Sequence, residues 1–238
     1  MYEGKKILAT ICARGGSKGV LGKNFRLLAG KPTICYSLDV IKKSKYIDDY
    51  IVSTDSDNII EAVKNHGFEI KFKRPEELAG DKVPRVEVVR HAVRWLEQEE
   101  SKFFDIIVDL GVATPLKSAS DVDGSIETLI KAGASNVISA TPSSRNPYYN
   151  MVEVVEGKVA IVKQATVKLN DRRDAPKTYD LNDAINAFLH DTLFSARPQL
   201  NDKTQLFIMP PERSVDIDEE IDFIIAESIL KKNLESGN

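Results

Sequence analysis

Two apolar patterns alternate through the first 140 residues, and this alternation limits the possible folds more than any other feature of the chain. Short β-rich runs end in turn or polar residues, as in KILATICA, YIVSTD, DIIVDLG and NVISATP. Between them lie helical patterns with apolar residues at i, i+3, i+4 and i+7, such as VEVVRHAVRWLEQEE. Strands that alternate with helices form βαβ units. We therefore predict an α/β fold, a Rossmann-like and mostly parallel sheet with helices on both faces.

The pattern changes between residues 143 and 179. MVEVVEGKVAIV predicts a hairpin that turns at Glu156-Gly157, and a polar loop with several cations follows it. LFIMPPERSVDID then predicts a return to the sheet, and EEIDFIIAESILKK predicts a closing amphipathic helix. No repeat or linker divides the chain, so we predict one domain over residues 1–238. Residues 143–179 would be a small β-containing excursion, either a lid or a dimerisation arm.

Charge and cysteine content exclude several classes of protein. The formal net charge of −3 argues against general nucleic-acid binding. Cys12 and Cys35 are too few for a disulfide framework or a cysteine metal site. No apolar stretch approaches the roughly 18 residues of a membrane-spanning helix. We expect a cytoplasmic protein with neither a nucleic-acid nor a membrane partner.

A glycine-rich loop, TICARGGSKGVLGKN, follows the first predicted strand. Such a turn can direct several backbone N–H groups at one anion, and Arg14, Lys18 and Lys23 add positive charge. Ligands of parallel sheets bind beyond the carboxyl ends of the strands, which is where this loop lies. Its spacing matches neither G-x-x-x-x-G-K-[ST] nor G-x-G-x-x-G. We predict a polyphosphate site; the alternative is a mobile surface loop with solvated charges.

Two aspartates near the end of the chain are spaced for metal binding. In RSVDIDEE, Asp216 and Asp218 are two residues apart, so on an extended chain both carboxylates point the same way. Paired carboxylates beside a triphosphate are suitable ligands for Mg²⁺. The alternative is that Asp218 caps the last helix.

At this point the motifs resemble those of a known family. ARGGSKGVLGKN resembles the opening motif of the acylneuraminate cytidylyltransferases, which activate sialic-acid-like sugars with CTP. GKPTICYSLDVIKKS, IVSTDSDNII, RPEELAGD, ATPL and PERSVDID also match in order, so the resemblance covers nearly the whole chain. It implies transfer of CMP from CTP to the anomeric hydroxyl of a nonulosonic acid, with release of pyrophosphate. It also implies a homodimer in which the 143–179 excursion reaches toward the partner's active site.

The resemblance also assigns roles to individual residues. Asp216 and Asp218 would hold the catalytic Mg²⁺, and Arg14 and Lys23 would complete the catalytic set. The nucleotide would be bound by Ala13, Arg14, Gly15, Gly16, Ser17, Lys18, Lys23, Asn24, Arg74 and Ala79. The sugar acid would be bound by Lys117, Arg173, Lys177 and Asn182. For the cations of the excursion, the alternative is a solvated basic loop.

Two departures from the family pattern concern the acceptor. Enzymes for sialic acid usually read LQPTSPLR where this chain reads LGVATPLK, and close to LNGAIY where it reads LNDAINAF. These differences place Gly111 and Asp183 where a glutamine and a glycine are usual. The whole pattern is more similar to the branch that activates legionaminic-acid-type sugars. Two alternatives stay open: a transferase for 3-deoxy-manno-octulosonate or another sugar, and an inactive nucleotide-binding homologue.

Overall fold

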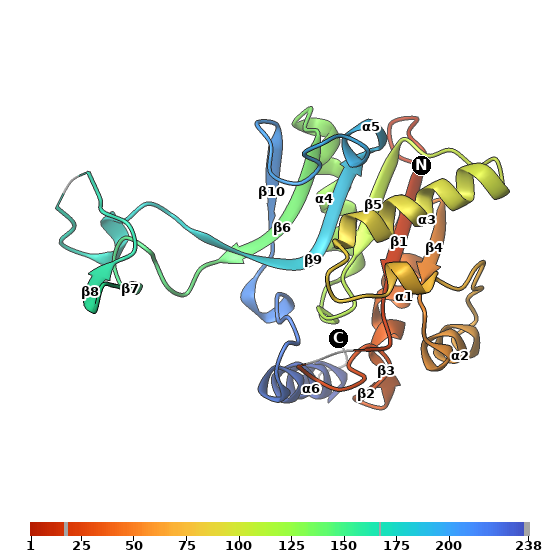
Figure 1. Ribbon diagram of the computed structural model, residues 1–238, viewed down its shortest axis with the longest axis horizontal. Helices are drawn as coiled ribbons and strands as arrows, with labels where there is room; N and C mark the ends of the chain where they lie inside the picture. The colour runs from red at the N-terminus through yellow and green to blue at the C-terminus, as the bar shows by residue number, and fades with distance from the viewer. Residues whose placement is uncertain (17–18, 167, 236–238) are drawn as a thin grey trace.

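A six-stranded sheet forms the centre of the molecule, with the strand order β10-β6-β9-β5-β1-β4 (Figure 1). The computed structural model describes residues 1–16, 19–166 and 168–235. The strands of this sheet are β1 (Ile7–Cys12), β4 (Asp49–Ser53), β5 (Ile106–Leu110), β6 (Asn136–Pro142), β9 (Tyr179–Leu189) and β10 (Thr204–Ile208). β4, β1 and β5 are parallel, as are β6 and β10, whereas β9 is antiparallel to both of its neighbours. The predicted mostly parallel α/β sheet is confirmed.

Helices cover both faces of the sheet, as the alternation of patterns predicted. The helices are α1 (Thr33–Lys43), α2 (Asp57–Asn65), α3 (Arg85–Glu99), α4 (Ala119–Lys131), α5 (His190–Leu193) and α6 (Glu220–Glu235). Successive side chains of a strand point to opposite faces. Ile7 and Ile11 of β1 therefore join the apolar core under α1, α2 and α4, while Leu8 packs with α3 and α5. A central strand buried on both faces explains why KILATICA is apolar without alternation.

Shorter elements complete the fold. Two small antiparallel sheets pair β2 (Leu27–Leu28) with β3 (Lys31–Pro32) and β7 (Val152–Val155) with β8 (Lys158–Ile161). Three 3-10 turns occupy η1 (Glu76–Leu78), η2 (Arg172–Asp174) and η3 (Pro211–Arg213). None of the helices in the described ranges combines the length and the apolar character needed to cross a bilayer.

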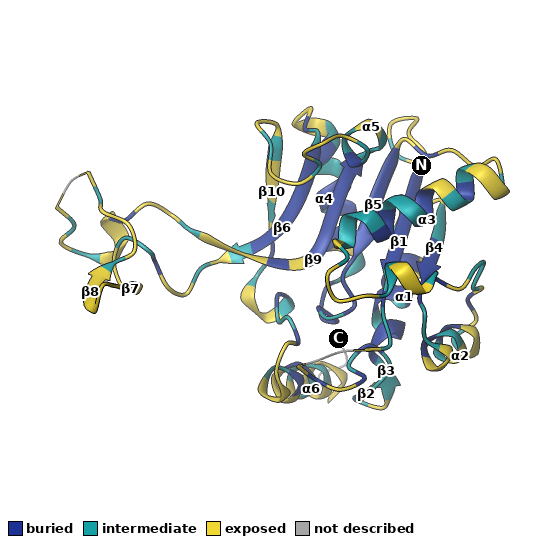
Figure 2. Cartoon of the chain, viewed as in Figure 1, coloured by how far each residue is buried: buried dark blue, intermediate teal, exposed yellow. Residues whose placement is uncertain are grey.

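The predicted excursion leaves the sheet after β6 and returns as β9 (Figure 1). It carries the β7–β8 hairpin far from the sheet, and Figure 2 shows that most of this hairpin is exposed. Glu156 and Gly157 have φ angles of 51° and 76°, which are those of a two-residue hairpin turn. The predicted turn is therefore confirmed. Because the chain must come back from this excursion, β9 enters the sheet antiparallel to β6, which the sequence patterns did not predict.

The segment that contains Asp216 and Asp218 is not part of a strand, although the sequence predicted one. β10 ends at Ile208, and residues 214–218 form no strand. The alternative role of Asp218 as the cap of α6 is also wrong. Asp222 accepts the backbone N–H groups of Asp218 and Glu219 at the start of that helix. Asp218 is thus free of a capping role.

Candidate active site

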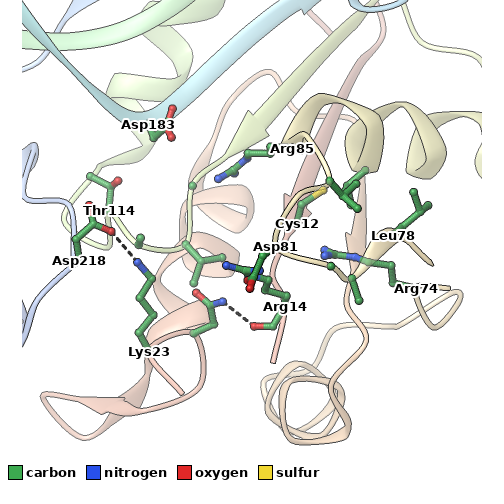
Figure 3. Close-up of a pocket in the computed structure, with 18 of the residues that line it drawn as sticks. Cys12, Arg14, Lys23, Arg74, Leu78, Asp81, Arg85, Thr114, Asp183 and Asp218 are labelled. Atoms are coloured by element: carbon green, nitrogen blue, oxygen red, sulfur yellow. Dashed lines mark hydrogen bonds and ion pairs between the residues drawn. The ribbon is translucent and has the colours of Figure 1, made fainter. Parts of the chain in front are cut away.

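A pocket of about 310 Å³ lies at the carboxyl ends of β1 and β5 (Figure 3). This is the edge where parallel sheets bind their ligands. Several residues that the sequence singled out line this pocket: Arg14, Lys23, Asn24, Arg74, Ala79, Asp216 and Asp218. The glycine-rich loop and the aspartate pair, about 200 positions apart in the sequence, therefore meet at one site.

Lys23 joins the loop to the aspartate pair. Its ammonium donates to the backbone oxygen of Ile217 at 2.5 Å. It also donates to a carboxylate oxygen of Asp218 at 3.0 Å (Figure 3). Asn24 donates to the backbone oxygen of Arg14 at 2.9 Å, and Arg14 pairs with Asp81 across the pocket. These contacts hold Lys23 beside the aspartate pair and Arg14 beside Asp81. Positive charge and carboxylates side by side suit a triphosphate with a divalent cation.

The rest of the glycine-rich loop is held by neighbouring strand ends. The N–H of Gly15 donates to Asp55, which follows β4, at 3.1 Å. Gly15, Gly16 and the buried Ala13 do not line the pocket, although they connect β1 to Lys23. The predicted contacts of Ser17 and Lys18 lie outside the described residues.

Arg74 forms the wall at the other end of the pocket. Its side chain is buried and donates to the hydroxyl and backbone oxygens of Ser53, at 3.0 and 2.5 Å, and to the backbone oxygen of Ala13 at 3.3 Å. Burial lowers the pKa of this guanidinium. Ala79, immediately after η1, lines the same pocket. Arg74 therefore braces the ends of β1 and β4.

Asp216 and Asp218 lie on either side of Ile217, which is fully buried and donates its N–H to Ala113. Burial, and then the charge of Asp218, raise the pKa of Asp216 to about 6. A divalent cation bound by both carboxylates would offset the repulsion between them, so the pair fits Mg²⁺. In the described ranges, no three His, Cys, Asp or Glu side chains form a metal cluster. A cation held here would take its other ligands from water and phosphate, as Mg²⁺ usually does.

Two residues expected at the sugar are instead turned into the protein. Lys117 is 4% exposed, and its ammonium donates to the hydroxyl of Ser37 and to the backbone oxygens of Gly111 and Thr114. Asn182 is buried, accepts from Ser139 and donates to Ser214. Neither lines the pocket. Their contact with the sugar stays a prediction; in the structure Lys117 holds the loop at residues 111–117, and Asn182 ties β9 to its neighbours.

Arg173 and Lys177 lie on the excursion and do not line the pocket of their own chain. Arg173 is largely exposed and pairs with Asp171 two residues away. The structure therefore does not bring these two cations to the site formed by the rest of the chain.

The pocket also contains groups that the motifs did not indicate. Arg85, the first residue of α3, lines it, as do Cys12 and Asp183. Asp183 was visible in the sequence only as a departure from the family pattern. Arg85 gave no signal, because a charged residue at the start of a helical pattern is usually solvated. Burial, and then the charge of Asp109, raise the pKa of Cys12 to about 12, so this residue stays a neutral thiol.

Comparison with known proteins identifies the family of the chain. The protein family described as cytidylyltransferase matches residues 8–224. The chain belongs to the cytidylyltransferase family. This confirms the resemblance that the sequence motifs indicated.

Two relatives match over almost their whole length. One is post-translational flagellin modification protein B of Campylobacter coli, 39% identical over 232 residues, which are 97% of this chain and 98% of that protein. The other is CMP-N,N'-diacetyllegionaminic acid synthase of Campylobacter jejuni, 39% identical over 230 residues, or 96% and 97% of the two chains. This cytidylyltransferase also shares its fold with a CMP:2-keto-3-deoxy-manno-octonic acid synthetase solved in complex with CTP. That match has a TM-score of 0.69 at 15% identity and covers 96% of this chain and 99% of the other.

Proposed function

We propose that this cytidylyltransferase transfers CMP from CTP to the anomeric hydroxyl of a legionaminic-type nonulosonic acid and releases pyrophosphate. The observation that carries the proposal is the contact of Lys23 with Ile217 and Asp218. It joins the predicted phosphate loop to the predicted metal ligands within one pocket. The relative named CMP-N,N'-diacetyllegionaminic acid synthase supports the choice of acceptor.

The chemistry needs positioning and charge neutralisation more than covalent catalysis. The acceptor hydroxyl attacks the α-phosphorus in line with the departing pyrophosphate. Arg14 and Lys23 bind the phosphates and stabilise the negative charge that moves onto the leaving group. Asp216 and Asp218 would hold Mg²⁺, which when bound neutralises phosphate charge and favours the ionised form of a nearby hydroxyl.

Pyrophosphate release with CTP and Mg²⁺ tests the proposed function. The acceptors are N-acetylneuraminate, legionaminate, pseudaminate and 3-deoxy-manno-octulosonate, each assayed alone. Release is expected to be fastest with legionaminate. Faster release with 3-deoxy-manno-octulosonate would reassign the acceptor. CTP binding without release from any acceptor would identify an inactive homologue and overturn the proposal.

A homodimer built through the excursion is the second part of the proposal. Val154 and Val159 are opposite each other in the β7–β8 hairpin and are 69% and 70% exposed. A two-stranded hairpin is at best marginally stable alone, and exposed apolar side chains on one face favour a partner surface. A second copy of the chain would bury them and would bring Arg173 and Lys177 toward the partner's pocket.

Replacing both valines with aspartate is expected to give a monomer, because two buried carboxylates would be unpaired in the interface. Light scattering on the eluting protein measures the mass. Glu153→Gln, on the other face of the same hairpin, is the matched control and should stay dimeric. A monomeric wild-type protein, or a V154D/V159D variant that remains a dimer, would contradict this part of the proposal.

A further inference from the structure

Arg85 has a fixed position in the pocket wall, and the proposed reaction gives this residue no role. Its Nε donates to one carboxylate oxygen of Asp109 at 2.5 Å. Asp109 is 2% exposed and lies on β5, and its other oxygen accepts the hydroxyl of Thr10 on β1 at 2.8 Å. Both oxygens of a buried carboxylate are therefore engaged. Asp109 therefore fixes the orientation of the Arg85 guanidinium and acts as a positioning residue.

The guanidinium of Arg85 is only partly satisfied by the protein. Its Nη2 is buried and has no hydrogen-bond partner within the described ranges. An unpaired buried donor costs free energy and calls for an explanation. About one third of the side chain remains exposed, and the residue lines the pocket. Burial lowers the pKa of Arg85, but the charge of Asp109 outweighs it and raises the pKa overall, so the group stays cationic.

The position of Arg85 relative to the other cations indicates which ligand it faces. Arg14 and Lys23 belong to the phosphate loop, and Arg74 braces the opposite end. Arg85 points away from Arg74, toward the part of the pocket that contains Asp183 (Figure 3). Its charge acts on Asp216, and the charge of Asp183 acts on it. Arg85 is thus near the proposed metal ligands but outside the phosphate loop.

In an α-keto sugar acid, the anomeric carbon carries both the carboxylate and the hydroxyl whose oxygen attacks. When that hydroxyl lies near Asp216, the carboxylate must lie within a few ångströms of it. Arg173 and Lys177 of the same chain do not line the pocket, whereas Arg85 lines it together with Asp216. Since a guanidinium fixed through Nε can still bind a carboxylate through its other N–H groups, we infer that Arg85 binds the carboxylate of the acceptor.

This inference rests on the proposed function, and steady-state kinetics separates the two. Arg85→Met is assayed with CTP and the sugar acid varied in turn, and with the acid replaced by its C1 carboxamide. Loss of a charge-assisted contact is expected to raise the KM for the sugar acid by about 10- to 100-fold. The KM for CTP should change less than about twofold. The wild-type enzyme should prefer the acid to the carboxamide, and the variant should lose that preference.

Two further variants keep the result interpretable if Arg85→Met is unstable. R85M/D109N removes both charges and keeps the Thr10 contact, so it should fold and show the same loss of preference. Arg85→Lys keeps a cation but cannot engage both Asp109 and the ligand, so it should recover only part of the loss. Arg94→Met removes a cation from the exposed side of the same helix and should behave as wild type.

The outcomes that overturn the inference are distinct. An equal rise in the KM for CTP would assign Arg85 to the phosphates. An unchanged preference for the acid in both Arg85→Met and R85M/D109N would show that another group binds the carboxylate. Absence of pyrophosphate release by the wild-type enzyme across all acceptors would overturn the proposed function and this inference with it.

Discussion

Asp216→Asn is expected to slow turnover by about 100- to 1,000-fold while making the metal-free protein more stable at pH 8. Asparagine keeps the shape of the side chain but removes the charge that would hold a divalent cation. Loss of comparable charge stabilisation in enzymes lowers kcat by about 100- to 1,000-fold. CTP binding should change far less, because Arg14 and Lys23 remain. Pyrophosphate release and CTP titration measure the two effects.

The stability gain follows from the pKa of Asp216. Burial, and then Asp218, raise this pKa from 3.8 to about 6. Between these values the native protein keeps a proton that the unfolded chain has lost, so the stability contributed by this group falls as the pH rises. Above pH 6 the cost is constant, and at about 1.4 kcal/mol per pKa unit it amounts to at most about 3 kcal/mol. Below pH 3.8 both states are protonated and the cost disappears.

Thermal unfolding in EDTA checks the prediction. Asp216→Asn should melt up to about 6–12 °C above wild type at pH 8, since 1 kcal/mol shifts the Tm of a chain of this size by about 2–4 °C. At pH 4, where the unfolded carboxyl is still partly ionised, the difference should shrink to about 1–2 °C. Glu219→Gln, at an exposed neighbouring residue, is the control. Its activity and its Tm should equal those of wild type at both pH values. Full activity in Asp216→Asn would show that the aspartate pair is not the metal site. A Tm of Asp216→Asn below that of wild type at pH 8 would contradict the expected cost of burying the ionised Asp216 carboxylate.

The parts of the site that the sequence predicted depend on local patterns. The glycine-rich loop follows a strand that is recognisable from its own residues, and the βαβ order fixes the sheet edge at which the loop lies. Asp216 and Asp218 are presented together because Ile217 between them is an anchor in the apolar core. Alternation of apolar and acidic residues was therefore informative even though the segment is not a strand. Local chemistry and fold order were enough to bring these groups to one pocket.

The parts that could not be predicted depend on contacts between distant segments. A lysine such as Lys117 is normally solvated, and its burial here requires acceptors from Ser37, Gly111 and Thr114. Arg85 is oriented by Asp109, 24 positions away, through a bond that no spacing rule indicates. The direction of β9 depends on where the excursion returns. Each of these features is settled by tertiary packing rather than by local pattern.

The second large effect is expected at Gly111. A Cβ at this position would lie 2.1 Å from the backbone oxygen of Asp183, a separation that real structures do not allow. Gly111 also donates its N–H to Ala184 at 3.0 Å, so the two segments cannot separate without losing that bond. Gly111→Ala should therefore destabilise the fold by about 3 kcal/mol, near the upper end of the usual cost of overpacking. The corresponding fall in Tm is about 6–12 °C.

Two comparisons identify the obstructing atom. Gly80→Ala is the control, because its Cβ would have only an ordinary contact, 3.8 Å from Val83, and should leave Tm nearly unchanged. Asp183→Gly removes a side chain but leaves the carbonyl in place, so G111A/D183G should remain about 3 kcal/mol less stable than Asp183→Gly alone. Recovery of wild-type stability in the double variant would show instead that the Asp183 side chain is the obstacle. If the carbonyl is the obstacle, the departures from the family pattern at Gly111 and Asp183 have one structural cause. β9 approaches the 111–117 loop so closely that no side chain fits at position 111. The glutamine usual at this position in enzymes for sialic acid could then be restored only by moving β9.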